Sequence, residues 1–96
     1  MKYYILKDKK VVHCSYKEWM AWVENKGDNR VDLTKVGDYT VSTVFLCVSF
    51  DNDTCFETMV FKGESYSDLD CYRCATWEEA EKQHQQAVEK WSKANV

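Results

Sequence analysis

The chain has no proline and only three glycines among its 96 residues. This excludes a collagen-like or proline-rich segment, and three isolated glycines cannot form a glycine-rich loop that binds a nucleotide phosphate. No run of residues approaches the roughly 20 apolar positions that a membrane-spanning helix needs. The first apolar run is short, is followed at once by charged residues, and lacks the pattern of a signal peptide. We therefore expect a cytoplasmic protein without a membrane partner.

Apolar side chains are abundant by contrast, at 45% of the chain, and 15% of the residues are aromatic. This content predicts a packed core and excludes intrinsic disorder. A chain of this length suits one core, so we expect a single domain over residues 1–96. Five cysteines, an odd number in a chain without a secretion signal, are typical of reduced thiols.

The net charge of −3 is unevenly distributed. Residues 1–37 carry eight Lys or Arg and five Asp or Glu, whereas residues 38–81 carry two and ten. Phosphate contacts need basic side chains, so an acidic middle segment disfavours direct binding of nucleic acid. It suits a partner protein with a basic surface. The alternative is an ordinary acidic face in contact with water.

A first helix is predicted from Tyr16 to about Lys26. Ser15 precedes it and Glu18 lies three residues further on, which is the capping-box pattern at a helix start. Trp22 falls at the edge of the apolar stripe of this helix. A half-exposed tryptophan either packs at the rim of a core or anchors a partner, so Trp22 is a candidate binding residue. The stripe itself consists of Tyr16, Trp19, Met20 and Val23.

A second helix is predicted from Trp77 to about Lys93, and Thr76 with Glu79 repeats the capping box. His84 lies on its apolar side, where a packed and hydrogen-bonded histidine is the ordinary interpretation. A functional role would need a partner such as Glu57. The apolar stripe consists of Trp77, Ala80, His84, Ala87, Val88 and Trp91.

The fold class predicted is α+β, with a single-layer antiparallel sheet of four to five strands and two helices in the order ββαβββα. In the segment Tyr39–Phe50 both faces are apolar, which one half-solvated sheet face does not require. Either the two helices cover both faces, or one face meets a partner or a second copy of the chain. Strands are predicted at Lys2–Lys7, Val11–Ser15, Tyr39–Phe50, Cys55–Lys62 and Leu69–Ala75, with a weaker one at Arg30–Val36.

Two sets of side chains could carry chemistry. Cys71 and Cys74 have the spacing of a zinc or thiol-redox pair, but residues three apart on a strand point to opposite faces. Whether these two thiols are free is left open. Glu57, Arg73 and His84 could together form a ligand or catalytic site if they converge. The simpler interpretation, which we favour, pairs Glu57 with Arg73 across neighbouring strands. We expect no cofactor and no metal.

Several segments carry a resemblance to a known family: VSTVFL at 41–46, FETMVF at 56–61, and TWEEA at 76–80 with Arg73 before it and His84 after it. They resemble a family of small proteins of bacteriophages, prophages and their hosts that has no assigned activity. In that family the segment after VSTVFL contains Gly, an apolar residue, Asp and His, followed by a loop rich in Gly and Pro. Here residues 47–50 are CVSF and the loop 51–54 is short. Any chemistry of that Asp-His pair would be lost from this chain.

The resemblance implies a phage-type protein in the host cytoplasm. Together with the composition, it favours a non-enzymatic protein that binds a host or phage protein, one form of which is antagonism of a host defence system. A homo-oligomer through the sheet face is a further expectation. The alternatives are a small enzyme or ligand-binding domain using Glu57, Arg73 and His84, and a zinc-stabilised module using Cys71 and Cys74.

Overall fold

The structure is a computed structural model that describes residues 2–26, 29–46, 48–49, 54–63 and 68–94. Two helices and two antiparallel sheets make up these residues, which confirms the α+β class. The elements in order are β1 (Lys2–Lys7), β2 (Lys10–Cys14), α1 (Tyr16–Lys26), β3 (Arg30–Val36), β4 (Tyr39–Phe45), β5 (Val48–Ser49), β6 (Phe56–Lys62), β7 (Asp68–Cys74) and α2 (Trp77–Ala94).

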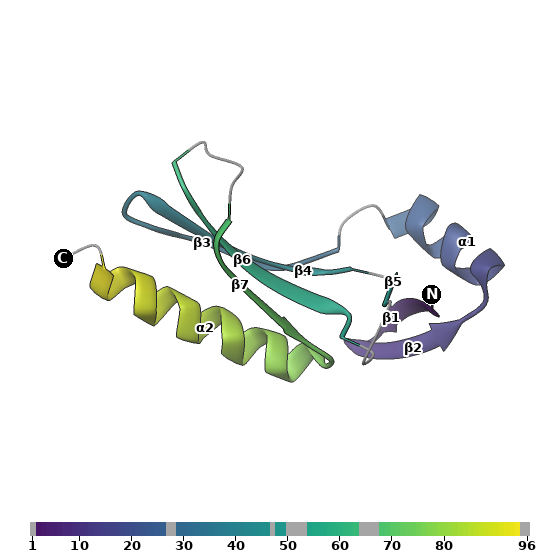
Figure 1. The fold of residues 1–96 in the computed structure, drawn as a ribbon. Coiled ribbons are helices and arrows are strands. Elements are labelled where there is room, and N and C mark those ends of the chain that lie inside the picture. The colour runs from purple at the N-terminus through teal and green to yellow at the C-terminus, as the bar shows by residue number, and fades with distance from the viewer. Residues whose placement is uncertain (1, 27–28, 47, 50–53, 64–67, 95–96) are drawn as a thin grey trace.

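The two sheets lie at opposite ends of an elongated molecule of 47 × 23 × 23 Å (Figure 1). The large sheet has the strand order β3-β4-β6-β7, and α2 lies along one of its faces. The small sheet has the order β2-β1-β5, and α1 packs against its central strand β1. The prediction of a single sheet in the order ββαβββα is therefore wrong.

The second sheet arises because the predicted strand Tyr39–Phe50 is two strands. β4 ends at Phe45, and the chain then enters the small sheet, where Val48 pairs with Tyr3 and Ser49 with Lys2. At the crossing point the Leu46 N–H donates to the carbonyl of Cys55 at 2.6 Å. One continuous apolar segment thus serves two sheets. Cys47 and Phe50, which also belonged to the prediction, lie outside the described residues.

The capping box at Ser15 is confirmed, and at Thr76 the structure shows the threonine cap, with Glu79 Oε1 accepting from the Thr76 hydroxyl. The Glu18 N–H donates to Ser15 Oγ at 3.2 Å, while the Ser15 N–H donates to Glu18 Oε1 at 3.2 Å. At the start of α2 the Glu79 N–H donates to Thr76 Oγ1 at 3.2 Å. Each cap satisfies backbone donors that a helix start otherwise leaves unpaired, and a cap of this kind typically contributes about 1 kcal/mol. The sequence also predicts Gly27 at the left-handed position that follows the first helix, and this residue lies outside the described residues.

An aromatic joint connects the two sheets. Phe45 packs at 5.3 Å from Phe56 and meets Trp22 edge-on at 5.7 Å, and Phe56 meets Trp77 edge-on at 6.2 Å between ring centroids. Trp22 therefore belongs to the joint. Tyr16 and Val23, expected on the buried stripe of α1, are 56% and 38% exposed instead. The other buried residues of this cluster are Tyr4, Cys55, Cys74 and Ala80.

The β1–β2 turn reaches the start of α2. Asp8 and Lys9 both have positive φ, 51° and 67°, between the paired residues Lys7 and Lys10. A lysine in this left-handed region costs roughly 1–2 kcal/mol. The Lys9 ammonium lies 5.6 Å from the ring centroid of Trp77, and this cation–π contact offsets part of the conformational cost.

Candidate functional site

The two faces of the large sheet have different surroundings. Side chains alternate between the faces along each strand. One set on β4 and β6, which includes Val41, Phe45 and Val60, is fully buried beneath α2 and the aromatic joint. We call this the covered face. The helix is amphipathic in the way the sequence predicts, with Ala80, His84 and Ala87 buried against the sheet.

The opposite face of the large sheet is not covered by α1 or α2 (Figure 1). Leu33 is 50% exposed there, and Met59 and Phe61 are partly exposed. Of the two alternatives for the sheet faces, coverage of each face by one helix is therefore excluded, because α1 packs on the small sheet. We call this surface the open face; by register it comprises Leu33, Lys35, Thr40, Ser42, Val44, Glu57, Met59, Phe61, Cys71 and Arg73.

Glu57 and Arg73 form a pair on the open face. They lie opposite each other on β6 and β7, and the Arg73 Nε and Nη2 atoms are both 2.9 Å from Glu57 Oε2. The predicted cross-strand pair is thus confirmed. The Glu57 side chain is only 13% exposed while that of Arg73 is 53% exposed, so the guanidinium closes over the carboxylate on the solvent side. The carboxylate is already occupied by this partner.

His84 lies on the covered face and is completely buried. Its Nδ1 atom is 2.8 Å from Thr43 Oγ1, which is in turn 2.7 Å from Thr58 Oγ1. Its Nε2 atom is 2.8 Å from Thr34 Oγ1. Both ring nitrogens therefore have a hydroxyl partner, and the interpretation of His84 as a packed, hydrogen-bonded histidine is confirmed. We call His84, Thr34, Thr43 and Thr58 the His84 node.

A carboxylate stands at the edge of the His84 node. Asp32 Oδ2 lies 3.6 Å from His84 Nε2, and the Asp32 side chain is half exposed. Carboxylate, imidazole and the Thr43 hydroxyl thus follow one another as in a nucleophilic triad. Thr43 and His84 have no exposed surface, however, so a substrate could not reach the hydroxyl. Burial lowers the pKa of His84, and the nearby Asp32 opposes that shift. The arrangement is a buried polar network and does not support catalysis.

The three residues proposed from the sequence as one site, Glu57, Arg73 and His84, do not converge, and the separate candidate Trp22 lies elsewhere. Glu57 and Arg73 are on the open face, His84 is on the covered face, and Trp22 packs at the aromatic joint. Sequence reasoning did not find the threonine partners of His84. Thr43 and Thr58 look like ordinary strand residues, and only the register that places them opposite each other reveals them.

Cys71 and Cys74 point to opposite faces of β7, as expected for strand residues three apart. Cys71 is exposed on the open face and Cys74 is 5% exposed beneath α2. Burial raises the pKa of the Cys74 thiol, which keeps it protonated. Within the part of the chain that the structure describes, no three His, Cys, Asp or Glu side chains gather into a metal site. The geometry therefore gives the zinc alternative no support.

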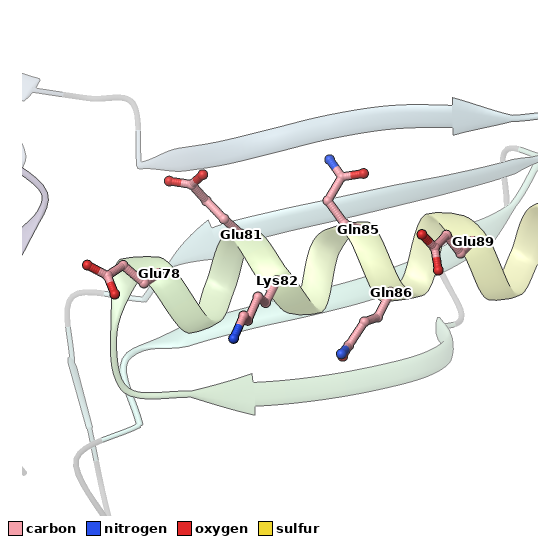
Figure 2. A pocket seen from close by; sticks show the side chains of 6 residues that line it. All are labelled: Glu78, Glu81, Lys82, Gln85, Gln86 and Glu89. Carbon is pink, nitrogen blue, oxygen red and sulfur yellow. The ribbon is translucent and has the colours of Figure 1, made fainter.

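The solvent side of α2 carries a shallow hollow (Figure 2). Its side chains splay to two sides of the helix and do not converge on a common point. Such a surface offers a ligand no enclosed volume. The lining residues are Glu78, Glu81, Lys82, Gln85, Gln86 and Glu89.

The two edge strands of the large sheet are each blocked at one point by a side chain. On β3, Asp32 Oδ1 accepts from the Leu33 N–H at 2.8 Å. On β7, Gln83 Nε2 donates to the Arg73 carbonyl at 3.3 Å. Occupied edge groups hinder the addition of a further strand. This leaves the open face as the better surface for a partner.

The acidic residues of the segment 38–81 are dispersed over the described structure. Glu57 faces Arg73, and Asp70 accepts from Lys90 at 2.8 Å on the other side of the sheet. Glu78, Glu79 and Glu81 lie in the first turns of α2, where negative charge favours the helix start. On the open face Glu57 pairs with Arg73, whereas Lys35 lies on β3 opposite Thr40, toward the other end of the sheet. The acidic segment thus does not produce an acidic open face.

Comparison with known protein families, with curated proteins and with solved structures finds no match to this chain. Among the described residues, no helix is both long enough and apolar enough to cross a membrane. The geometry of the chain itself therefore carries the functional argument.

Proposed function

We propose that this protein is non-enzymatic and acts by binding another protein through the open face of its large sheet. The observation that carries the proposal is a sheet with a helix on one face only. Leu33, Met59 and Phe61 provide apolar surface on the other face, with Glu57 and Arg73 beside them. An apolar surface bordered by polar groups is typical of an interaction site.

The enzymatic alternative has less support from the geometry. Glu57 and His84 would have to act from opposite faces of the sheet, and His84 is sealed beneath α2. A catalytic base must reach the substrate directly or through one water molecule. Neither arrangement is compatible with a fully buried imidazole.

The open face has the dimensions of a modest interaction surface. Four strands about 4.8 Å apart and about seven residues long give a footprint of roughly 450 Å². Stable interfaces bury about 800 Å² of accessible surface on each partner. A partner that also contacts neighbouring surfaces would bind more tightly.

The finer form of the proposal rests on the resemblance to small phage proteins. It places the partner in the bacterial host or in the phage itself, and antagonism of a host defence system is the specific role that fits this context. The expectation of a basic partner rests on the acidic residues outside the open face, since the open face itself carries both charge signs.

The test compares two charge substitutions of the same kind. Met59→Glu places a carboxylate in the open face, and Gln86→Glu places one on the solvent side of α2 as a matched control. We expect a protein captured from bacterial lysate by the wild-type chain to be retained by the Gln86→Glu variant. We expect Met59→Glu to reduce its capture at least about tenfold, which corresponds to 1.4 kcal/mol of binding free energy.

Equal capture by the Met59→Glu and wild-type chains would contradict the proposal, and so would capture of nothing above background. Thermal unfolding of both variants shows whether either substitution damages the fold. Light scattering of the wild-type and Met59→Glu chains separates the remaining outcome. A dimer at micromolar concentration that Met59→Glu dissociates would identify a second copy as the occupant of the open face.

A further inference from the structure

His84 occupies the middle of the interface between α2 and the large sheet. On one side of it, Ala80 belongs to the cluster of the aromatic joint, and on the other side Ala87 packs with Val41 and Val60. The two apolar clusters are thus separated by a polar node. A buried polar group that is fully hydrogen-bonded fixes one arrangement of its neighbours, because any shift leaves donors and acceptors unpaired. The His84 node therefore determines the position of α2 on the large sheet.

The node is balanced for a neutral imidazole. A neutral ring has one N–H donor and one acceptor nitrogen, and Thr34 and Thr43 can each donate or accept as required. Protonation turns both nitrogens into donors. The hydroxyl of Thr43 can still accept from His84 while donating to Thr58. The hydrogen bonds can thus rearrange, but the positive charge itself is buried and needs a counter-charge.

Asp32 is the carboxylate near enough to supply that counter-charge, at 3.6 Å from His84 Nε2. From β4 and β6, the node receives only the hydroxyls of Thr43 and Thr58 and the apolar side chains beside them. β7 contributes the Cys74 thiol and the Tyr72 phenol to the same face, and the phenol donates to Asp70. On α2 itself the neighbouring charged residues, Glu81 and Lys82, are exposed.

We propose that the His84 node is a proton-controlled latch. With a neutral ring it holds α2 on the covered face, and charging of the ring in mild acid loosens the helix from the sheet. Asp32 sets the pH at which this happens. The inference concerns the covered face and does not depend on what binds the open face.

The direction of the effect follows from the burial of His84. The pKa of His84 in the folded chain, where α2 is docked, lies below the ordinary value for histidine. At a pH between these two pKa values, the state with α2 detached therefore binds more protons than the docked state. Docking of α2 therefore weakens as the pH falls from about 6.5, the ordinary pKa of histidine, toward the lower pKa of the folded chain. Asp70, whose own pKa is held below its usual range by hydrogen bonds from Lys90, Tyr72 and Trp91, stays ionised at pH 5.

Amide hydrogen exchange tests the latch. Protection factors, which are corrected for the intrinsic effect of pH on exchange, are measured at pH 7.5 and pH 5.0 in the wild-type chain. We expect protection of the α2 amides to fall between these two pH values, because the detached state binds a proton that the docked state does not. Protection in the β1–β2 hairpin should fall less. An equal fall throughout the chain, or none, would overturn the proposal.

Two variants assign the effect to named residues. His84→Gln keeps a donor and an acceptor but cannot take a proton, so its α2 protection should not respond to pH between 7.5 and 5.0. Asp32→Asn removes the counter-charge and keeps an oxygen for the Leu33 N–H, so α2 should loosen at a higher pH than in the wild type. A response of His84→Gln equal to that of the wild type contradicts the latch. If the His84→Gln variant does not fold, an NMR titration of the His84 imidazole in the wild-type chain tests the latch instead. A His84 pKa of about 6.5 or above would contradict the latch.

Discussion

At the scale of single residues, the packing of the covered face depends on small buried side chains whose polar groups are hydrogen-bonded to one another. Thr43 and Thr58 are 0% and 1% exposed, and their hydroxyls are linked to each other and to His84. A buried hydroxyl or imidazole without a partner costs more free energy than its hydrogen bond contributes. The node therefore stabilises the fold only as a complete set, and removal of one member leaves the others unpaired.

Thr43→Val tests this dependence because valine has nearly the shape of threonine and lacks the hydroxyl. We expect the free energy of unfolding to fall by about 1–3 kcal/mol, since His84 Nδ1 and Thr58 Oγ1 each lose a partner. Thr40→Val, on the open face of the same strand, is the matched control and should stay within about 0.5 kcal/mol of the wild type. Urea unfolding at pH 7.5 measures both. A Thr43→Val variant as stable as the control would show that the node contributes little.

At the scale of elements, α2 can lie close to the sheet because its contact residues are small. Ala80 and Ala87 are buried on either side of His84, while the larger Trp77 and Trp91 pack at the two ends of the helix. Trp91 also packs at 4.8 Å from Tyr39 and donates from its Nε1 to Asp70 at 3.3 Å. The helix is thus held tightly in the middle and fastened by aromatic and polar contacts at its ends.

Ala87→Leu should separate α2 from the sheet in the middle. Overpacking of a tight interior site costs about 1–3 kcal/mol, so we expect a loss of that size in the free energy of unfolding. Gln86→Leu adds the same side chain on the exposed neighbouring position and should change stability by less than about 0.5 kcal/mol. Denaturant midpoints with unchanged slopes are the measurement. Equal midpoints for the two variants would mean that α2 tolerates a larger side chain against the sheet.

The elements differed in how far the sequence could predict them. The two helices were predictable because their starts are local: Ser15 with Glu18, and Thr76 with Glu79, lie within one turn of each other. The division of Tyr39–Phe50 was not, since neither proline nor glycine marks the point where the chain changes sheets. The pairing of Glu57 with Arg73 followed from strand order. The threonine partners of His84 required the register, which depends on contacts between distant segments.

At the scale of the whole molecule, the main feature is that a helix covers one face of the large sheet and leaves the other face open. α1 packs on the small sheet at one end of the elongated molecule, which leaves α2 as the helix packed on the large sheet (Figure 1). The described chain therefore has an apolar core on the covered face and a mixed surface on the open face. The first accounts for stability, and the second is the surface that we assign to a partner.

Site-specific photocrosslinking in bacterial cells tests this assignment most directly. A photoreactive phenylalanine analogue replaces Met59 on the open face in one variant and Gln86 on the solvent side of α2 in another. Our account predicts a discrete crosslinked adduct with another protein from position 59, and none from position 86. Adducts of equal yield from both positions, or an adduct from position 86 alone, would contradict the assignment of the open face as the binding surface.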